Sequence, residues 1–441
     1  MTEIYFSFDT EDYTSDTSSD AVRDEARILE EYGVRGNFNI VGYLAREFVR
    51  HRRQDVLDAL RAHTISFHSL RHSYHPTINE YTDREDYAAA RAELALQERE
   101  GMGMVKAACG VDGFPAACPP GDSFSYVAMY AYADWDIPLY VGSLFNTPDG
   151  AGVYYCNGFH VDYHYALEHL LREPDFSPEA FLDKIAGRRR VFLYNHPNRV
   201  LYAAHWDMVN YNGENRNPMH GWEEAPRYPL ADTALYYQRL CALLAALKAD
   251  GRFALCSVDE LRDRACAGIG GRVVTRSQLP ALRASLEEAF RWVTQPVSLS
   301  VADVFYAARH FLLRPEPVFR PGRTHGFLYE PAGTAEPVTL DAAEIRTLAE
   351  SCDPERFLPP FFELHGKRIG PADLLFAMLD AALGAERVVV RPRPQQCAYE
   401  DAYPALRDLR LRGSWIHAKD FEDRWLSDRL RLQAWTIRPE V

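Results

Sequence analysis

The stretch that decides the fold is IYFSFDTED, residues 4–12. Residues 4–8 are a short apolar run typical of a buried strand, and Asp9, Glu11 and Asp12 follow it directly. In parallel α/β folds, ligands bind at the carboxyl ends of strands. Carboxylates this close repel one another unless a cation or proton lies between them. The stretch therefore predicts a buried strand that ends in a ligand-binding cluster; a solvated acidic turn is the alternative.

Helix-like and strand-like segments alternate over the first part of the chain. Helical spacing recurs at residues 21–32, 50–62, 87–100 and 233–249, and strand-like runs at 36–42, 191–194 and 253–256. Such alternation implies parallel strands joined by right-handed crossovers. The pattern favours the α/β class, and its length suits a barrel better than an open sheet.

The alternation ends at residues 268–271, where GIGG predicts a turn-rich break. A chain of 441 residues exceeds the ~250–300 that one core usually fills. We therefore expect two domains, residues 1–270 and a mainly helical accessory domain of unknown role at 271–441. Within the second, residues 297–308 resemble 367–378, and each segment places Ala-Asp (Asp303, Asp373) at the start of an apolar helix.

The composition excludes several classes of protein. The net charge of −14 and the lack of basic runs make nucleic acid and anionic membranes poor partners. No uncharged apolar stretch reaches the ~18 residues of a membrane span. The chain begins with a strand-like segment rather than a signal peptide, so a cytoplasmic location is expected. None of the eight cysteines forms a CxxC motif, which suits reduced, mostly buried thiols.

A second polar cluster lies at residues 63–76, which contain four of the 15 histidines. His68 and His72 are four residues apart, so on a helical turn both imidazoles would lie on one face, close enough to share a metal ion. Two histidines and one carboxylate leave coordination positions open for water and substrate, as in catalytic metal sites. A histidine-rich surface loop is the alternative.

These motifs, in this order, resemble the polysaccharide deacetylase superfamily (NodB homology domain, carbohydrate esterase family 4). Residues 33–42 look like its glycine-introduced strand, 63–72 its second motif, 119–125 its third and 193–197 its last. The resemblance covers roughly residues 1–265. It implies a distorted (β/α) barrel with fewer than eight βα units. It also implies metal-dependent hydrolysis of an amide C–N bond in an amino sugar or glycan precursor. Zinc fits the set of two histidines and one carboxylate, and other divalent ions would also fit.

The resemblance also assigns roles to residues. It makes Asp9 the general base, His68 and His72 the metal ligands, and His196 the general acid that protonates the leaving amine. The third ligand is open because the family usually has two adjacent aspartates where this chain has Asp-Thr-Glu-Asp. Asp12 is preferred; Glu11, on the same strand face as Asp9, is the alternative.

The chain departs from the family at Cys118, where an arginine usually orients the catalytic base. A thiol cannot make the bidentate contact of a guanidinium, although Arg71 or Arg199 could replace it from another loop. Two other functions therefore stay open: a catalytically silent protein that binds glycan or scaffolds a partner, and a metal-free hydrolase of a small cyclic amide. Metal content would separate them.

Residues 196–215 form a polar segment rich in aromatic and amide side chains. From it, Trp206, Asp207 and Asn210 are expected to contact the carbohydrate substrate; an irregular covering loop is the alternative. Residues 154–156 and 159–165 are expected at the same opening.

Overall fold

The computed structural model describes residues 1–211, 221–411 and 415–441. The chain divides into two compact units, each made of several segments. Unit 1 comprises residues 1–151, 160–264 and 410–426, and unit 2 comprises residues 152–159, 265–409 and 427–441. A single boundary near residue 270 would therefore separate residues 410–426 from the unit with which they pack.

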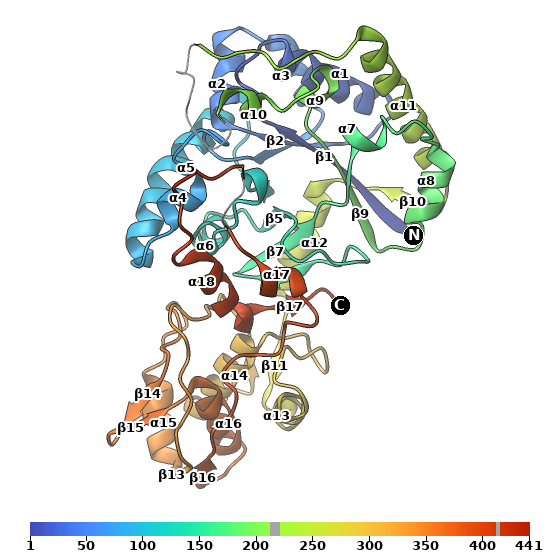
Figure 1. Cartoon of the computed structure of the whole chain (residues 1–441). Helices are drawn as coiled ribbons and strands as arrows, with labels where there is room; N and C mark the ends of the chain where they lie inside the picture. Colours follow the sequence, from blue (N-terminus) through green and yellow to red (C-terminus); the bar gives the residue numbers. More distant parts are fainter. Residues whose placement is uncertain (212–220, 412–414) are drawn as a thin grey trace. The chain divides into compact units, whose positions relative to one another are not determined.

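A curled parallel sheet forms the centre of unit 1 (Figure 1). Neighbouring strands pair in parallel in the order β5 (Leu139–Gly142), β4 (Ala116–Ala117), β3 (Thr64–Phe67), β2 (Asn37–Ile40), β1 (Thr2–Thr10), β9 (Arg190–Asn195) and β8 (Tyr165–Ala166), with β10 (Phe253–Leu255) beside the start of β1. The predicted α/β class is confirmed, with a curled, half-barrel sheet.

Helices cover this sheet (Figure 1). The predicted helices at 21–32, 87–100 and 233–249 are α1 (Ser18–Glu31), α5 (Tyr87–Cys109) and α11 (Leu230–Ala249). Two predictions were wrong. The expected helix at 50–62 is instead the end of α2 (Gly42–Arg50) and α3 (Gln54–Leu60), because Arg52 has a left-handed backbone with φ 55°. The expected break at 268–271 is the end of α12 (Val258–Gly270), because glycines are tolerated in a last helical turn.

Strand register brings the polar residues of unit 1 together. Asp9 in β1 lies opposite Asn39 in β2, and Asn39 lies opposite Ser66 in β3. His68 follows β3, and His196 follows β9. Because the strands are parallel, all these positions lie at one edge of the sheet, the edge where ligands bind in such folds.

Unit 2 combines helices with short antiparallel strand pairs. Its helices α14 (Val301–Leu313), α15 (Ala342–Glu350) and α16 (Pro371–Ala382) pack against one another. Two of its strand pairs are β13 (Val338–Asp341) with β16 (Arg387–Val390) and β14 (Phe362–Leu364) with β15 (Lys367–Ile369). The similar segments noted in the sequence open α14 and α16, with Asp303 and Asp373 in the first turn of each.

Candidate active site

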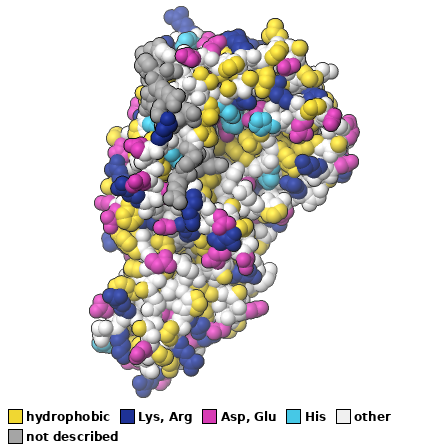
Figure 2. Space-filling view, in the orientation of Figure 1, with side chains coloured by type: hydrophobic (Ala, Val, Ile, Leu, Met, Phe, Trp, Pro, Cys, Tyr) yellow, Lys and Arg dark blue, Asp and Glu magenta, His cyan; other side chains and the backbone are white. Residues whose placement is uncertain are grey.

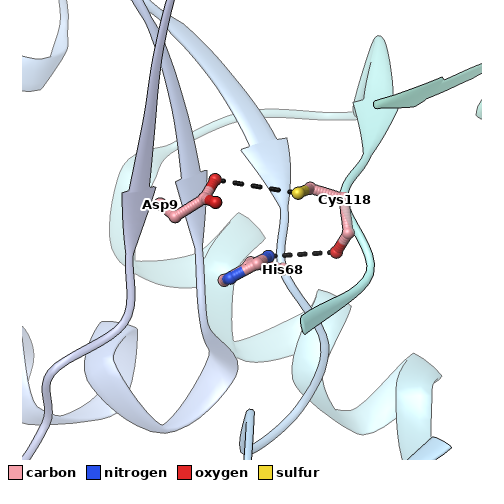
Figure 3. Close-up of side chains that lie close together, drawn as sticks. All are labelled: Asp9, His68 and Cys118. Atoms are coloured by element: carbon pink, nitrogen blue, oxygen red, sulfur yellow. Dashed lines mark hydrogen bonds between the residues drawn. The ribbon is translucent and has the colours of Figure 1, made fainter. Parts of the chain in front are cut away.

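The Asp9 carboxylate is held by its neighbours at the end of β1. Its Oδ1 accepts hydrogen bonds from Asn39 Nδ2 (2.8 Å) and from the Tyr163 hydroxyl (2.7 Å). The Cys118 thiol lies 3.7 Å from the same oxygen, and Figure 3 shows Asp9, His68 and Cys118 converging from the carboxyl ends of β1, β3 and β4. The other oxygen, Oδ2, lies 3.9 Å from His196 Nε2. Asp9 thus keeps one carboxylate oxygen available to accept a proton.

His68 has one ring nitrogen committed and one available. Its Nδ1 lies 3.0 Å from the Cys118 carbonyl oxygen, which can only accept, so Nδ1 carries the proton (Figure 3). Its Nε2 is buried and has no hydrogen-bond partner among the described residues. A buried lone pair without a partner is costly. This nitrogen is therefore suited to bind a metal ion.

His72 is oriented by a chain of two hydrogen bonds. Ser73 Oγ donates to Asp207 Oδ2 (2.8 Å), so it accepts from His72 Nδ1 (3.0 Å). This fixes Nδ1 as protonated and turns Nε2 toward Glu11, whose Oε2 lies 2.7 Å away. Burial alone would lower the pKa of His72, but Glu11 and Asp207 raise it to about 9. The arrangement resembles the carboxylate-oriented histidines of metal sites.

Glu11, rather than Asp12, faces the two histidines. Its Oε2 lies 3.4 Å from His68 Nε2 as well as 2.7 Å from His72 Nε2, and one ligand atom from each residue lies within 4.8 Å of the others. Burial alone would raise the pKa of Glu11, but His72 and His196 lower it well below its usual range. Three buried donor atoms that converge in this way fit a divalent ion.

Asp12 is turned away from the histidines. Its oxygens accept hydrogen bonds from Thr14 N (2.9 Å), Thr14 Oγ1 (2.6 Å) and Ser18 Oγ. Burial raises the pKa of Asp12 to about 6, against these hydrogen bonds. The geometry therefore favours Glu11, the alternative named from the sequence, as the third ligand, and gives Asp12 a role in holding the loop between β1 and α1.

His196 is paired with a carboxylate that the sequence did not single out. Its Nδ1 donates to Glu168 Oε1 over 2.6 Å, and Glu168 lies at the start of α7 (Leu167–Leu170). Burial alone would lower the pKa of His196, but Glu168 and Glu11 raise it to about 10. Nε2 is left facing Asp9, so the imidazolium has a proton to donate at this side of the site.

The three residues expected to contact substrate are buried. Trp206 Nε1 donates to Glu11 Oε1 (3.0 Å), and Asp207 orients His72 through Ser73. The Asn210 amide donates to the Trp206 carbonyl (2.8 Å) and so holds the helix α10 (Trp206–Asn210). The geometry gives all three contacts within the protein. Residues 212–215 of the same polar segment lie outside the described residues.

The loop after β3 differs from the helical turn expected for His68 and His72. Ser69 and His72 have left-handed backbones, with φ 69° and 54°, and the segment between the two histidines is irregular. The two ring centroids still lie 5.1 Å apart. Tight turns, rather than helical periodicity, bring the imidazoles together.

One aromatic side chain at the site comes from the far end of the sequence. Trp415 lies 6.1 Å from His72 between ring centroids, with 27° between the planes, and 38% of its surface is exposed. Its segment is tied to the helix α4 (Ile78–Thr82), which follows the loop after His72: the Ala418 amide donates to Glu80 Oε1 (2.6 Å). Histidine side chains also gather on the face of unit 1 that Figure 2 shows.

The comparisons with known proteins give structural relatives only, since no protein family and no curated protein matches the sequence. The chain is similar to a protein from Mycobacterium smegmatis assigned as a polysaccharide deacetylase, with 16% identity, 60% of this chain and 90% of that chain covered, and a TM-score of 0.38. It is similar to the Xyl-CE4 domain of a multidomain xylanase from the hindgut metagenome of Trinervitermes trinervoides, with 16% identity, 60% and 90% coverage and a TM-score of 0.31. It is also similar to a CE4 family pseudoenzyme from Bacillus anthracis, with 14% identity, 45% and 56% coverage and a TM-score of 0.29.

These structures belong to the family that the motifs resemble, and they include both enzymes and a pseudoenzyme. At these identities and TM-scores, any activity of this chain has to be argued from its own side chains. None of the described helices is both long enough and apolar enough to cross a membrane.

Proposed function

We propose that unit 1 is a metal-dependent hydrolase of amide C–N bonds that removes the N-acetyl group from an amino sugar or glycan precursor. The observation that carries this proposal is the convergence of Glu11 Oε2 with the Nε2 atoms of His68 and His72 in a buried position. Asp9 and His196, on adjoining strands, supply a base and an acid beside it.

Glu11, His68 and His72 would hold the divalent ion. The two imidazoles and one carboxylate suit zinc. When bound, such an ion supplies Lewis-acid polarisation of the amide carbonyl and a lowered pKa for the attacking water.

The remaining steps fall to the chain's own residues. Asp9 Oδ2 accepts the proton of the attacking water, because Oδ1 is already occupied by two donors. His196 Nε2 donates its proton to the leaving amine as the C–N bond breaks. The products are acetate and the free amino sugar. Glu168 keeps His196 protonated and oriented until that step.

Trp415 is the side chain that we assign to substrate contact. It is the exposed large aromatic residue of unit 1 among the described residues, and it lies next to a proposed metal ligand. The face of an indole binds the apolar C–H face of a sugar ring. A pyranose against Trp415 would lie beside the histidines, where its acetamido group has to be cleaved.

A pair of variants tests the ligand assignment. Full-length protein is saturated with zinc and dialysed, its metal content is measured, and release of acetate from N-acetylglucosamine oligomers is followed. Glu11→Gln should lose most of the metal and the activity, whereas Asp12→Asn should keep the metal. Retention by Glu11→Gln, or wild-type protein without stoichiometric metal, would contradict the proposal. Stoichiometric metal without hydrolysis would favour the catalytically silent alternative.

A further inference from the structure

We infer that Tyr163 is the positioning residue for Asp9, fixing which carboxylate oxygen takes the proton. This inference rests on the proposed function and names a residue that acts through another. Tyr163 follows β7 (Gly158–Asp162), and its backbone amide donates to the Gly142 carbonyl (2.7 Å), so its main chain is anchored to β5.

The Tyr163 hydroxyl can donate its proton only to the Asp9 carboxylate. A carboxylate can only accept, so the hydroxyl donates to Asp9 Oδ1 over 2.7 Å. A hydroxyl has one proton, and the Tyr163 oxygen must therefore act as acceptor toward its other neighbours. Asn39 Nδ2 does donate to it over 3.0 Å, and two further groups that can donate lie near it, Cys118 Sγ at 3.2 Å and Ser7 Oγ at 3.3 Å. The network has one direction, and it ends on Asp9.

The side chain that carries this hydroxyl is rigid. The ring of Tyr163 stacks on that of Tyr194 in β9, with centroids 4.4 Å apart and planes 15° apart. A stacked ring that is anchored at its backbone has little freedom to follow a moving carboxylate. The hydroxyl therefore holds Asp9 in one rotamer, in which Oδ2 faces His196 Nε2.

No guanidinium performs this task among the described residues. Arg71 donates to the Pro76 carbonyl (3.2 Å), and Arg199 donates to the Tyr202 carbonyl (3.0 Å), away from Asp9. Cys118, which contacts Asp9 through its thiol, adds only a weak donor. Asp9 is thus oriented by neutral donors, of which Tyr163 and Asn39 make the short contacts.

Tyr163→Phe removes the hydroxyl and keeps the stacked ring. We expect kcat to fall roughly 10–10²-fold with KM and metal content nearly unchanged, because only the orientation of the base is lost. Tyr5→Phe is the matched control: Tyr5 stacks on Phe192 in the same strand, β9, and its hydroxyl also donates to a carboxylate, Glu3. Its hydroxyl lies beside Glu3, near the amino end of β1 and away from Asp9, so the variant should leave kcat unchanged.

A double-mutant cycle separates positioning from a merely structural role. In an Asp9→Asn background, Tyr163→Phe should cost nothing further, because the group that it positions is gone. The inference would be overturned if the losses in kcat of the two single variants added in the double variant, or if Tyr163→Phe alone kept the wild-type kcat. Equal thermal unfolding of wild type and Tyr163→Phe shows that the fold is intact.

Crystal structures of wild type and Tyr163→Phe decide the inference without any activity. Displacement of the Asp9 carboxylate in the variant supports it, and an unchanged rotamer overturns it. If the wild type hydrolyses nothing, the proposed function fails, while this comparison still decides the role of Tyr163.

Discussion

Two pairs of buried carboxylates, one pair in each unit, differ in their partners. In unit 2, Asp303 accepts from the backbone amide of Ser300 (2.9 Å), and Asp373 accepts from that of Thr334 (2.8 Å). In unit 1, Glu11 and Glu168 face imidazoles. Asp303 bonds to the N-cap amide of its own helix and pairs with Arg272, whose guanidinium stays charged, and Asp373 bonds through one oxygen to the amide of a loop residue. The second pair is set among groups that can exchange protons.

This difference separates structural from functional burial. A carboxylate that caps a helix stabilises the fold whatever the protein does. Buried charges that depend on other titratable groups carry a desolvation cost that their mutual attraction often only balances. Such clusters persist where a function uses them, and perturbed proton affinities mark candidate sites. The predictions below test whether the two kinds of carboxylate behave differently.

The largest effect is expected at Asp9. Asp9→Asn is nearly isosteric but cannot take the water proton, so activity should fall by ~10²–10⁴-fold while zinc remains bound. Initial rates of acetate release and metal analysis of the same preparation measure both. Near-normal turnover would mean that another group is the base and would weaken the contrast between the units.

The buried carboxylate of Glu25, in unit 1, should lower the stability of the folded protein at high pH. Burial raises its pKa to about 8, against hydrogen bonds from Tyr236 and Asn195. Because the folded pKa exceeds the unfolded value, its stabilising contribution is complete below about pH 4.5 and is lost as the pH rises through about 8. At pH 9, the free energy of unfolding of Glu25→Gln should therefore exceed that of wild type by roughly 2–4 kcal/mol. Denaturant titration of both proteins measures this difference.

The difference should nearly vanish at pH 5, where wild-type Glu25 is protonated in the folded state. Glu31→Gln, at the exposed end of the same helix, is the control and should show no such pH dependence. Equal stabilities of Glu25→Gln and wild type at both pH values would show that burial does not raise the pKa of this carboxylate.

The hydrogen bonds behind His72 should tune metal affinity. Ser73→Ala removes the link between His72 Nδ1 and Asp207, so zinc should bind about 10–100-fold more weakly. Competition with a chelator measures the affinity. Ser123→Ala is the control, because Ser123 is also buried but its Oγ has no hydrogen-bond partner among the described residues. Equal losses in both variants would point to general destabilisation.

Trp415 should affect substrate binding rather than chemistry. Trp415→Ala should raise KM roughly 3–10-fold on an oligosaccharide and leave kcat within about twofold, because a stacked aromatic contact contributes about a kcal/mol. Trp292→Ala, in unit 2, serves as the control. An unchanged KM would remove Trp415 from the substrate site.

The smallest effect is expected in unit 2. Ser300 and Asp303 form a capping box at the start of α14, so Ser300→Ala should cost about 1 kcal/mol of stability. Zinc affinity should not change. A measurable change in zinc affinity would contradict the distinction between structural and functional carboxylates, because a helix cap in unit 2 would then affect the site in unit 1.

Local patterns in the sequence determined much of this protein. Short strand-like runs predicted β1, β2, β9 and β10, because strands buried on both faces are rich in apolar residues. Helical spacing predicted α1 and α11, because apolar residues recur on the face that a helix buries. The acid cluster and the histidine pair were also visible, since a parallel sheet gathers strand ends at one edge. Strand alternation even placed Glu11 on the face of Asp9.

Only the tertiary structure decided how these residues meet. The chain turns after Glu11 so that Asp12 bonds to Ser18, and no local pattern specifies the direction of that turn. Tyr163 reaches Asp9 from 154 residues away, and Trp415 lies beside His72 through a segment from the far end of the chain. Such contacts depend on the packing of whole strands and loops, and sequence spacing does not encode them.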